Sequence, residues 1–397
     1  MKGQKNSSKT TPKIAIVCVT NDLVTDQRVN KTCLALQKAG YEVIETGRLL
    51  ANSLPINDRP YRTRRIKLCF NKGPLFYAEY NLRLFFYLLF AESDLIYAND
   101  LDTLLAAFWA AKLRKKKLIY DSHEYFTEVP ELVSRPKTQR IWQKIEKFVF
   151  PKLDKIITVN QSIAKLYADQ YHKEVQVVRN IPPTFIPERT KTRKELDLPE
   201  DKHILIIQGT GINIDRGAEE ACLAMKYLKN CILLIIGSGD VFPTLERMIA
   251  ENQLQDKILI KPKMPVAELR QYTLNSDLGL AIDKNTNLNY LYSLPNKLFD
   301  YIHSEIPVLS SNLVEIKQII DHYNIGYFIE NHDPQHIATT IKSIFADQAR
   351  YNTVKQNTHQ AKKELAWENE EKTLLQIIAG VFHTTPLQQK LRKNNEE

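Results

Sequence analysis

The segment with the most chemical information spans residues 292–307 and reads YSLPNKLFDYIHSEIP. Its Ser-Leu-Pro-Asn turn precedes a predicted helix that carries Lys297 and Asp300, and Ser293 or Asn296 would cap that helix. A helix N-terminus beside a lysine is a ready site for a diphosphate. One turn further on, Asp300 would accept hydrogen bonds from ribose hydroxyls. The plainer alternative is an ordinary helix start with a solvated Lys297–Asp300 pair.

A second candidate is the stretch 207–217, IQGTGINIDRG, which follows a predicted strand and precedes a predicted helix. Gly209 and Gly211 permit close backbone approach, and Arg216 would clamp a phosphate through two N–H groups. The stretch matches neither the GxGxxG fingerprint nor the P-loop, so a short loop with an exposed arginine remains an alternative. The Gly-Ser-Gly at 237–239 is more typical of a tight turn.

The N-terminal half also places polar side chains after its predicted strands. His123 would hydrogen-bond a sugar hydroxyl or move a proton, or it would be a structural residue that caps the segment starting at Glu124. Asp100 and Asp102 have the spacing of a metal-binding pair. Two carboxylates make a poor magnesium site without phosphate, so capping of the following helix is favoured. Arg28 is either a contact for an anionic substrate or a surface arginine.

The elements that must position these residues alternate regularly between apolar strands and helices. Residues 13–20 form a run rich in β-branched residues, typical of a strand buried on both faces, and a helix at 26–39 and a strand from Tyr41 complete a βαβ opening. After a Pro-rich, charged linker the alternation restarts at His203. The sequence therefore predicts an α/β fold of two Rossmann-like, doubly wound modules. Their ligands would lie in a cleft beyond the carboxyl ends of the strands.

The predicted boundaries divide the chain into five parts. These are a disordered tail at 1–12, a first Rossmann-like module at 13–185, a second Rossmann-like module at 200–350, C-terminal helices at 351–383 and a disordered tail at 384–397. The C-terminal helices include one long helix, which is expected at 349–378.

Composition limits the compartment and the partners. Fifty-five Lys and Arg against 46 Asp and Glu give a net charge of +9, which favours either anionic partners or a Lys-rich solvated surface. Five cysteines without a CxxC pair argue against a disulfide framework or zinc site and for a reducing compartment. The longest apolar runs fall well short of the about 20 residues that a membrane span needs.

Two surface features have alternative interpretations. The basic run KLRKKK at 112–117 is interpreted first as a solvated helix end, and otherwise as a contact for phospholipid or nucleic acid. The aromatic residues between 76 and 90 indicate a core helix first and a membrane-facing patch second.

Seven segments occur in an order that resembles the retaining glycosyltransferases of family 4, which have the GT-B fold. The resemblance is clearest to bacterial members that make surface polysaccharide, and it extends from Lys13 to about Phe382. The segments are DQRVNKTCLALQKAGYEV (26–43), LIYANDLDTLLAA (95–107), YDSHEYFTEVPEL (120–132), VVRNIP (177–182), IQGTGINIDRG (207–217), IIGSGD (235–240) and YSLPNKLFDYIHSEIPVLSSN (292–312).

The resemblance implies that the module at 13–185 binds the acceptor, that the module at 200–350 binds the nucleotide sugar, and that the C-terminal helices cross back to the first module. It also implies a role for each matching residue. Catalytic contacts to the donor diphosphate and donor sugar would come from Arg216, Lys297 and His123. Donor-binding positions would be Gly209, Ser293, Pro295, Asn296 and Asp300, the last on the ribose. Arg28, Asp100 and Glu124 would lie on the acceptor side.

The chain departs from the family pattern at the paired-glutamate motif. Tyr292 stands where the family has its first glutamate, and Asp300 replaces the second. Glu305 stands where the family usually has a glycine, just before the Ile-Pro that starts the next strand. Thr210 and Gly211 stand where a second basic residue is often found. These differences put the donor-sugar contacts in question.

The implied activity is that of a retaining hexosyltransferase that moves a sugar from a UDP- or GDP-sugar to a glycan or lipid-linked acceptor, without a metal or other cofactor. The resemblance places the protein in the cytoplasm, at the inner face of the cytoplasmic membrane with peripheral contact to anionic lipid, and predicts no nucleic-acid partner. The main alternative is a non-catalytic sugar-nucleotide-binding protein on the same fold. A nucleotide-sugar epimerase and a nucleic-acid-binding module are less favoured, since neither set of motifs is present.

Overall fold

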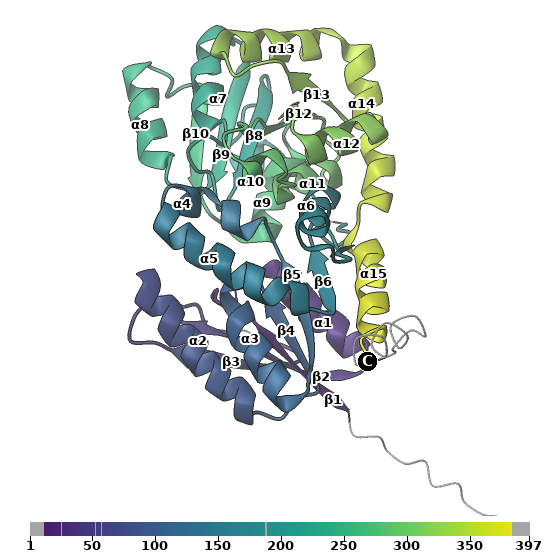
Figure 1. Ribbon diagram of the computed structural model, residues 1–397. Coiled ribbons are helices and arrows are strands. Elements are labelled where there is room, and N and C mark those ends of the chain that lie inside the picture. The colour runs from purple at the N-terminus through teal and green to yellow at the C-terminus, as the bar shows by residue number, and fades with distance from the viewer. Residues whose placement is uncertain (1–11, 25, 52, 57, 187–188, 383–397) are drawn as a thin grey trace, which may run out of the picture. The chain divides into compact units, whose positions relative to one another are not determined.

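The computed structural model describes residues 12–382, apart from residues 25, 52, 57, 187 and 188 (Figure 1). Except for Pro12, the tails predicted at 1–12 and 384–397 lie outside the described residues. The chain folds into two compact units. The first contains the residues up to Arg179 together with those from Glu371 onward, and the second contains Asn180–Glu370.

The first unit is built on a seven-stranded parallel sheet with strand order β3-β2-β1-β4-β5-β6-β7. Its central strands are apolar and buried on both faces, as the β-branched runs predict. The strands are β1 (Lys13–Cys18), β2 (Tyr41–Leu49), β3 (Arg62–Lys67), β4 (Leu95–Asn99), β5 (Lys117–Ser122), β6 (Lys155–Thr158) and β7 (Gln176–Val177).

Helices cover both faces of this sheet. Asp26 caps the first of them by accepting a hydrogen bond from the Val29 N–H. The helices are α1 (Gln27–Lys38), α2 (Gly73–Phe90), α3 (Leu101–Arg114), α4 (Pro130–Val133), α5 (Pro136–Val149) and α6 (Gln161–Tyr171). Helices α2, α3 and α5 lie side by side over one face (Figure 1).

The second unit has a six-stranded parallel sheet with order β10-β9-β8-β11-β12-β13. Leu205 and Ile207 of its central strand enter one hydrophobic core, whereas Ile204 and Ile206 enter the core on the opposite face. The strands are β8 (His203–Gly209), β9 (Cys231–Gly237), β10 (Ile258–Pro262), β11 (Leu278–Ala281), β12 (Val308–Ser311) and β13 (Gly326–Ile329).

The helices of the second unit alternate with these strands. They are α7 (Ala218–Ala224), α8 (Phe242–Glu251), α9 (Val266–Leu274), α10 (Leu288–Leu291), α11 (Asn296–His303), α12 (Val314–Tyr323), α13 (Pro334–Ala346) and α14 (Gln348–Glu364). A last helix, α15 (Trp367–Ala379), begins in the second unit and ends in the first. None of the described helices has the length and apolar character that crossing a bilayer requires.

The prediction of a single helix at 349–378 is wrong, because the structure has two helices there, α14 and α15. Residues 365 and 366 leave the helical path between α14 and α15, with Leu365 fully buried and at φ −88° and ψ 66°. The Trp367 N–H donates to the Pro182 carbonyl instead of continuing the helix. Burial of the Leu365 side chain and this bond to a distant segment therefore divide the helix.

Strand β3 and helix α5 were not predicted. The β3 sequence RTRRIK is mostly charged, and the strand lies at an edge where, among the strands that the structure describes, it pairs only with β2. An edge strand needs little apolar character, so hydrophobic patterning gives a weak signal for it.

Both sheets have the same switch point. Strand order reverses between β1 and β4 in the first unit, and between β8 and β11 in the second. In open α/β sheets, ligands bind at the carboxyl ends of the strands at this reversal. The loops after these four strands are therefore where a site is expected.

Candidate functional site

In the second unit, two cations meet at one buried carboxylate at the switch point. Asp283 lies just after β11 and is fully buried. The Lys297 Nζ, in the first turn of α11, is 3.1 Å from Asp283 Oδ1, and the Arg216 Nη1, in the loop after β8, is 3.7 Å from the same oxygen. Because β8 and β11 are neighbours in the sheet, the two sequence-predicted cations are brought together.

An aromatic ring fixes the Arg216 side chain from another direction. The guanidinium carbon lies 3.9 Å from the centroid of the Tyr290 ring, which is buried on α10. Arginine stacks favourably on aromatic faces, so the ring orients the plane of the guanidinium. Its buried Nε has no hydrogen-bond partner among the described residues. Arg216 is 22% exposed, which contradicts the alternative of a freely exposed loop arginine.

The protonation of Lys297 depends on its surroundings. Burial lowers the pKa of the ammonium, the Asp283 carboxylate raises it, and the Arg216 guanidinium lowers it again. The carboxylate therefore stabilises the charged form of Lys297. Lys297 is 11% exposed and paired with Asp283, so the alternative of a solvated Lys297–Asp300 pair is wrong.

The loop after β8 is supported by the loop after β9. The Ile212 N–H donates to the Ser238 carbonyl at 3.0 Å, and the Ser238 N–H donates to the Gly209 carbonyl at 3.1 Å. A Cβ on Gly237 would lie 1.7 Å from the Gly209 oxygen, and one on Gly239 would lie 1.8 Å from the Ile212 oxygen. The glycines at 237 and 239, for which the sequence favours a tight turn, thus allow two backbones to pack closely.

Helix α11 begins without a side-chain cap. Its N-cap is Pro295, and neither Ser293 nor Asn296 accepts a capping hydrogen bond, so the predicted cap is wrong. The Ser293 hydroxyl is buried with no hydrogen-bond partner among the described residues. With no cap, the backbone N–H groups of the first turn, beside Lys297, are left for an anion.

Asp300 is held at the end of β8. The Gln208 side-chain amide donates to Asp300 Oδ2 at 3.0 Å, and the Thr273 hydroxyl donates to Gln208 Oε1 at 2.7 Å. Gln208 and Thr273 are buried, whereas Asp300 is half-buried. These two consecutive hydrogen bonds therefore fix the direction of the Asp300 carboxylate.

The first unit has a buried ion pair near the carboxyl end of β5. Arg28 is 4% exposed and donates to both oxygens of Asp121, at 2.7 and 3.2 Å, and to the Val178 carbonyl at 2.8 Å. The Tyr97 hydroxyl donates to the same carboxylate at 2.9 Å. Although burial opposes it, the Arg28 charge holds the pKa of Asp121 well below its usual range. The interpretation of Arg28 as a surface residue is wrong, since its side chain is buried and bonded to Asp121.

His123 contacts three acceptors, one of which is the Asp121 carboxylate of this ion pair. Its Nδ1 is 3.3 Å from Asp100 Oδ2, and its Nε2 is 3.1 Å from Asn99 Oδ1 and 3.7 Å from Asp121 Oδ2. Burial would lower the pKa of the imidazole, but Asp100 and Asp121 raise it to about 9. At neutral pH His123 is therefore a cation whose two ring N–H groups are directed at these acceptors, which argues against a general base.

The sequence favoured Asp100 or Asp102 as a side-chain cap of the following helix, α3. Asp100 does not make this capping hydrogen bond. Its carboxylate instead accepts the His123 backbone N–H at 2.8 Å, and its φ of 57° lies in the left-handed region. Strained residues of this kind cluster at functional sites. Asp102 is buried and accepts the Thr20 hydroxyl at 2.6 Å, and burial raises its pKa to about 7. The two carboxylates therefore serve separate partners.

Glu124 is half-buried, and its main-chain carbonyl accepts the Ser122 hydroxyl at 2.7 Å. Among the described residues, no group of three or more His, Cys, Asp or Glu side chains is arranged to hold a metal ion.

Sequence reasoning missed Asp283, Tyr290 and Gln208. Asp283 follows the predicted strand at 278–282. His123 was selected because it is a polar residue that follows a predicted strand, and the same criterion would have selected Asp283. Tyr290 gave no signal, because its role depends on a contact with Arg216 that spacing does not reveal.

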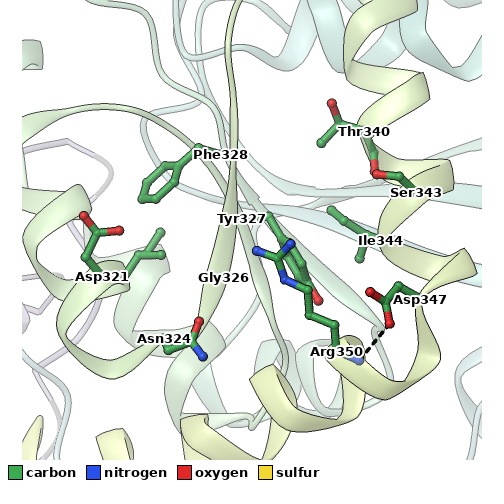
Figure 2. Close-up of a pocket in the computed structure, with 11 residues that line it drawn as sticks. Asp321, Asn324, Gly326, Tyr327, Phe328, Thr340, Ser343, Ile344, Asp347 and Arg350 are labelled. Carbon is green, nitrogen blue, oxygen red and sulfur yellow. Dashed lines mark hydrogen bonds between the residues drawn. The ribbon is translucent and has the colours of Figure 1, made fainter.

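A pocket of about 620 Å³ lies elsewhere in the second unit (Figure 2). It is lined by the start of β13 and by parts of α12, α13 and α14, with Arg350 5.1 Å from the Tyr327 ring. Because it lies at the amino end of an edge strand, it is separate from the residues at the carboxyl ends.

Comparisons with known proteins match nearly the whole described chain. The family model Glycosyltransferase Family 4 matches residues 27–183, and Glycosyl transferases group 1 matches residues 188–361. The amylovoran biosynthesis glycosyltransferase AmsK of Erwinia amylovora is 27% identical over 135 residues, 34% of this chain and 32% of AmsK. A D-inositol 3-phosphate glycosyltransferase of Xylanimonas cellulosilytica is 20% identical over 264 residues, 61% of this chain and 60% of that protein. The match thus spans about a third of the length of AmsK and about three-fifths of the length of the D-inositol 3-phosphate glycosyltransferase.

Solved structures with the same fold cover more of the chain. Sucrose-phosphate synthase from Thermosynechococcus elongatus has a TM-score of 0.76 at 18% identity, covering 93% of this chain and 99% of that one. Anabaena HepE in complex with UDP-glucose has a TM-score of 0.69 at 13% identity, covering 93% and 100%. The expected α/β GT-B fold is confirmed.

Proposed function

Because the chain belongs to glycosyltransferase family 4 and has the GT-B fold, we propose that it transfers a hexosyl group from a nucleoside diphosphate sugar to a hydroxyl acceptor with retention at the anomeric carbon. The observation that carries the proposal is the meeting of Arg216 and Lys297 at Asp283, beside the uncapped first turn of α11. This arrangement supplies two cations and backbone N–H groups to one anion at a topological switch point.

The proposed chemistry follows from the positive charge of Arg216 and Lys297 and from the N–H groups at the start of α11. When the bond between the anomeric carbon and the diphosphate oxygen breaks, its electron pair stays on the diphosphate. Arg216, Lys297 and the first turn of α11 stabilise the negative charge as it grows, which is the usual source of a large rate enhancement. The acceptor oxygen attacks from the same face, and its proton passes to the leaving phosphate. Asp300, directed by Gln208, accepts hydrogen bonds from the ribose.

We assign the donor to the UDP- or GDP-sugars, and HepE, a neighbour of the same fold, is described in complex with UDP-glucose. In the first unit, His123 is the proposed hydrogen-bond donor to a sugar hydroxyl, which would take the place of Asn99 at Nε2 while Asp100 keeps the ring charged. The acceptor is proposed to be a glycan or lipid-linked glycan of a surface polysaccharide. The relative AmsK, whose name refers to amylovoran biosynthesis, supports this assignment. Because two protein cations balance the leaving group, we propose that transfer proceeds without a metal.

A thermal-shift screen with UDP, GDP, ADP and CDP tests the donor site. A nucleotide at one hundred times its dissociation constant raises the free energy of unfolding by about 2.7 kcal/mol. We expect one nucleotide to give this shift, and Arg216→Ala and Lys297→Ala to abolish it. Arg247→Ala and Lys263→Ala, which remove exposed cations of the same unit, serve as matched controls and should keep it.

Turnover separates the enzyme from the main alternative. Tyr292, in the place of the family's first glutamate, motivates a non-catalytic nucleotide-sugar-binding protein. Consumption of the donor that requires an acceptor and persists in EDTA supports the proposed transferase. Nucleotide binding without turnover would support the alternative, and turnover that EDTA abolishes would contradict metal independence. No shift with any of the four nucleotides would contradict the donor site itself.

A further inference from the structure

Large apolar side chains are exposed along the outer sides of three neighbouring helices of the first unit. Phe90 at the end of α2 is 79% exposed, Leu113 on α3 is 60% exposed, and Ile141 on α5 is 58% exposed. We call this surface the aromatic–basic face. Its apolar members are Leu75, Leu82, Phe86, Phe90, Trp109, Leu113, Ile141 and Phe148.

Helical spacing and packing join these side chains into one surface. Phe86 and Phe90, like Trp109 and Leu113, are four residues apart and lie on one side of their helix. Helix α3 packs against both α2 and α5 (Figure 1). The rings of Trp109 and Phe148 are 5.9 Å apart and connect the exposed sides of α3 and α5. Monomeric proteins seldom expose a continuous apolar patch of this kind without a partner.

Cations predominate on the aromatic–basic face, although the exposed carboxylates Glu92 and Asp154 lie just after α2 and just after Lys152. Its exposed cations are Arg83, Lys112, Lys137, Arg140, Lys144 and Lys147 within the helices, with Lys115 and Lys152 just after them. The structure describes all three helices completely, and none of their carboxylates is exposed. Glu79 pairs with Arg83, while Asp102 and Glu146 are buried.

Cations and rings are interleaved on this surface. The Lys112 Nζ lies 5.4 Å from the Trp109 ring, and the Lys152 Nζ lies 3.5 Å from the Phe148 ring. Trp and Lys combine an apolar body with a polar end, and such residues are enriched where protein meets the lipid–water interface.

We propose that the aromatic–basic face docks on a phospholipid bilayer surface with anionic headgroups, the rings entering the headgroup region and the lysines contacting lipid phosphates. A second copy of this chain would oppose two cationic surfaces, which is unfavourable. A nucleic acid would satisfy the charge but leave the apolar side chains without a partner. A bilayer with anionic lipid satisfies both. The proposal does not depend on the proposed transfer reaction.

Trp109 provides a local probe of docking. It is 37% exposed, whereas Trp142 and Trp367, the other two tryptophans of the chain, are 7% and 6% exposed. Vesicles of phosphatidylcholine mixed with phosphatidylglycerol should shift the emission of the full chain to the blue, and vesicles of phosphatidylcholine alone should not. Trp109→Phe should remove the blue shift without preventing co-sedimentation.

Paired substitutions test the apolar and the charged parts separately. Phe86→Ser/Phe90→Ser and Lys144→Glu/Lys147→Glu should each weaken sedimentation with the mixed vesicles at least tenfold. Tyr227→Ser, which removes an exposed ring of the second unit, and Lys263→Glu are the matched controls and should bind as the unmodified protein does.

Melting temperature and the nucleotide-induced shift are measured on every variant. An unchanged melting temperature shows that the variant folds, and the nucleotide shift separates failure of lipid docking from failure of the donor site. Three results would overturn the proposal. The first is equal binding to neutral and mixed vesicles, or no binding to either. The second is full binding by both paired variants. The third is self-association, or DNA binding that displaces vesicles while the phenylalanine pair has no effect.

Discussion

At the residue scale, Asp283 connects the two cations of the donor site. Its carboxylate is the shared partner of Arg216 and Lys297, and its second oxygen, also buried, has no hydrogen-bond partner among the described residues. A buried charge is tolerated only when it is paired, so the three side chains depend on one another. Asp283 therefore acts as a positioning residue that prepares the cations for a diphosphate.

Replacement of Asp283 by asparagine should make donor binding sensitive to pH. Burial and the Arg216 charge both lower the pKa of Lys297, and the variant lacks the carboxylate that raises it. Lys297 will therefore lose its proton at a lower pH, and nucleotide affinity will fall as pH rises from 7 to 9. We expect the affinity ratio of unmodified protein to Asp283→Asn to grow about tenfold over this range, which is about 1.4 kcal/mol.

Isothermal titration with the active nucleotide at several pH values measures this ratio. Asp256→Asn, a change at an exposed carboxylate of the same unit, is the control and should leave the pH profile unchanged. Parallel profiles for the unmodified protein and Asp283→Asn would show that Asp283 does not maintain the charge of Lys297.

At the element scale, the loops after β8 and β9 form one structural unit. Gly239 in the second loop lies against the Ile212 carbonyl in the first, and the Ile212 N–H is bonded to Ser238. The first loop carries Arg216, so the second loop, which contributes no charged group to the anion site, sets the position of a cation. A short Gly-Ser-Gly sequence is thus an indirect part of the site.

Gly239→Ala tests this support. Its Cβ would lie 1.8 Å from the Ile212 oxygen, so one backbone must move, and overpacking of this kind costs about 1–3 kcal/mol. Gly211→Ala is the matched control, since its Cβ meets no atom within 4 Å. Chemical denaturation should show destabilisation for Gly239→Ala and a change within about 0.5 kcal/mol for Gly211→Ala. Equal stability of the two variants would refute the close packing of the two loops.

At the scale of the whole molecule, the chain consists of two units with separate sheets and cores. Every residue assigned to the diphosphate and ribose lies in the second unit, between Gly209 and Asp300. Hydrogen exchange with and without UDP, or the active nucleotide, reads out the two units separately. Nucleotide at one hundred times its dissociation constant should slow exchange of the slowest β8 and β9 amides by up to about a hundredfold, equivalent to 2.7 kcal/mol.

The β4 and β5 amides of the first unit serve as the internal control. We expect them to exchange at the same rate with and without the nucleotide, which lacks the sugar assigned to His123. Protection confined to β4 and β5 would place the nucleotide in the first unit and would contradict the proposed site in the second unit.

The sequence by itself determined most of the alternating strands and helices, the two βα modules and the segments that carry Arg216, Lys297 and His123. These follow from local rules: apolar runs indicate buried strands, glycines and prolines indicate boundaries, and polar residues after strands of a parallel sheet mark the functional edge. The family resemblance added the roles of those residues in donor binding, which remain proposals.

Only the tertiary structure decided which of these residues meet and which side chains face water. Asp283 joins Arg216 to Lys297 because β8 and β11 pair across the switch point, a contact that spacing does not encode. Arg28 is buried because Asp121, distant in sequence, lies beside it. In α2 both sides of the helix carry aromatic residues, so periodicity could not tell that Phe76 and Tyr80 are buried while Phe86 and Phe90 are exposed. Burial depends on what packs against a side chain, and that partner is supplied by distant parts of the chain.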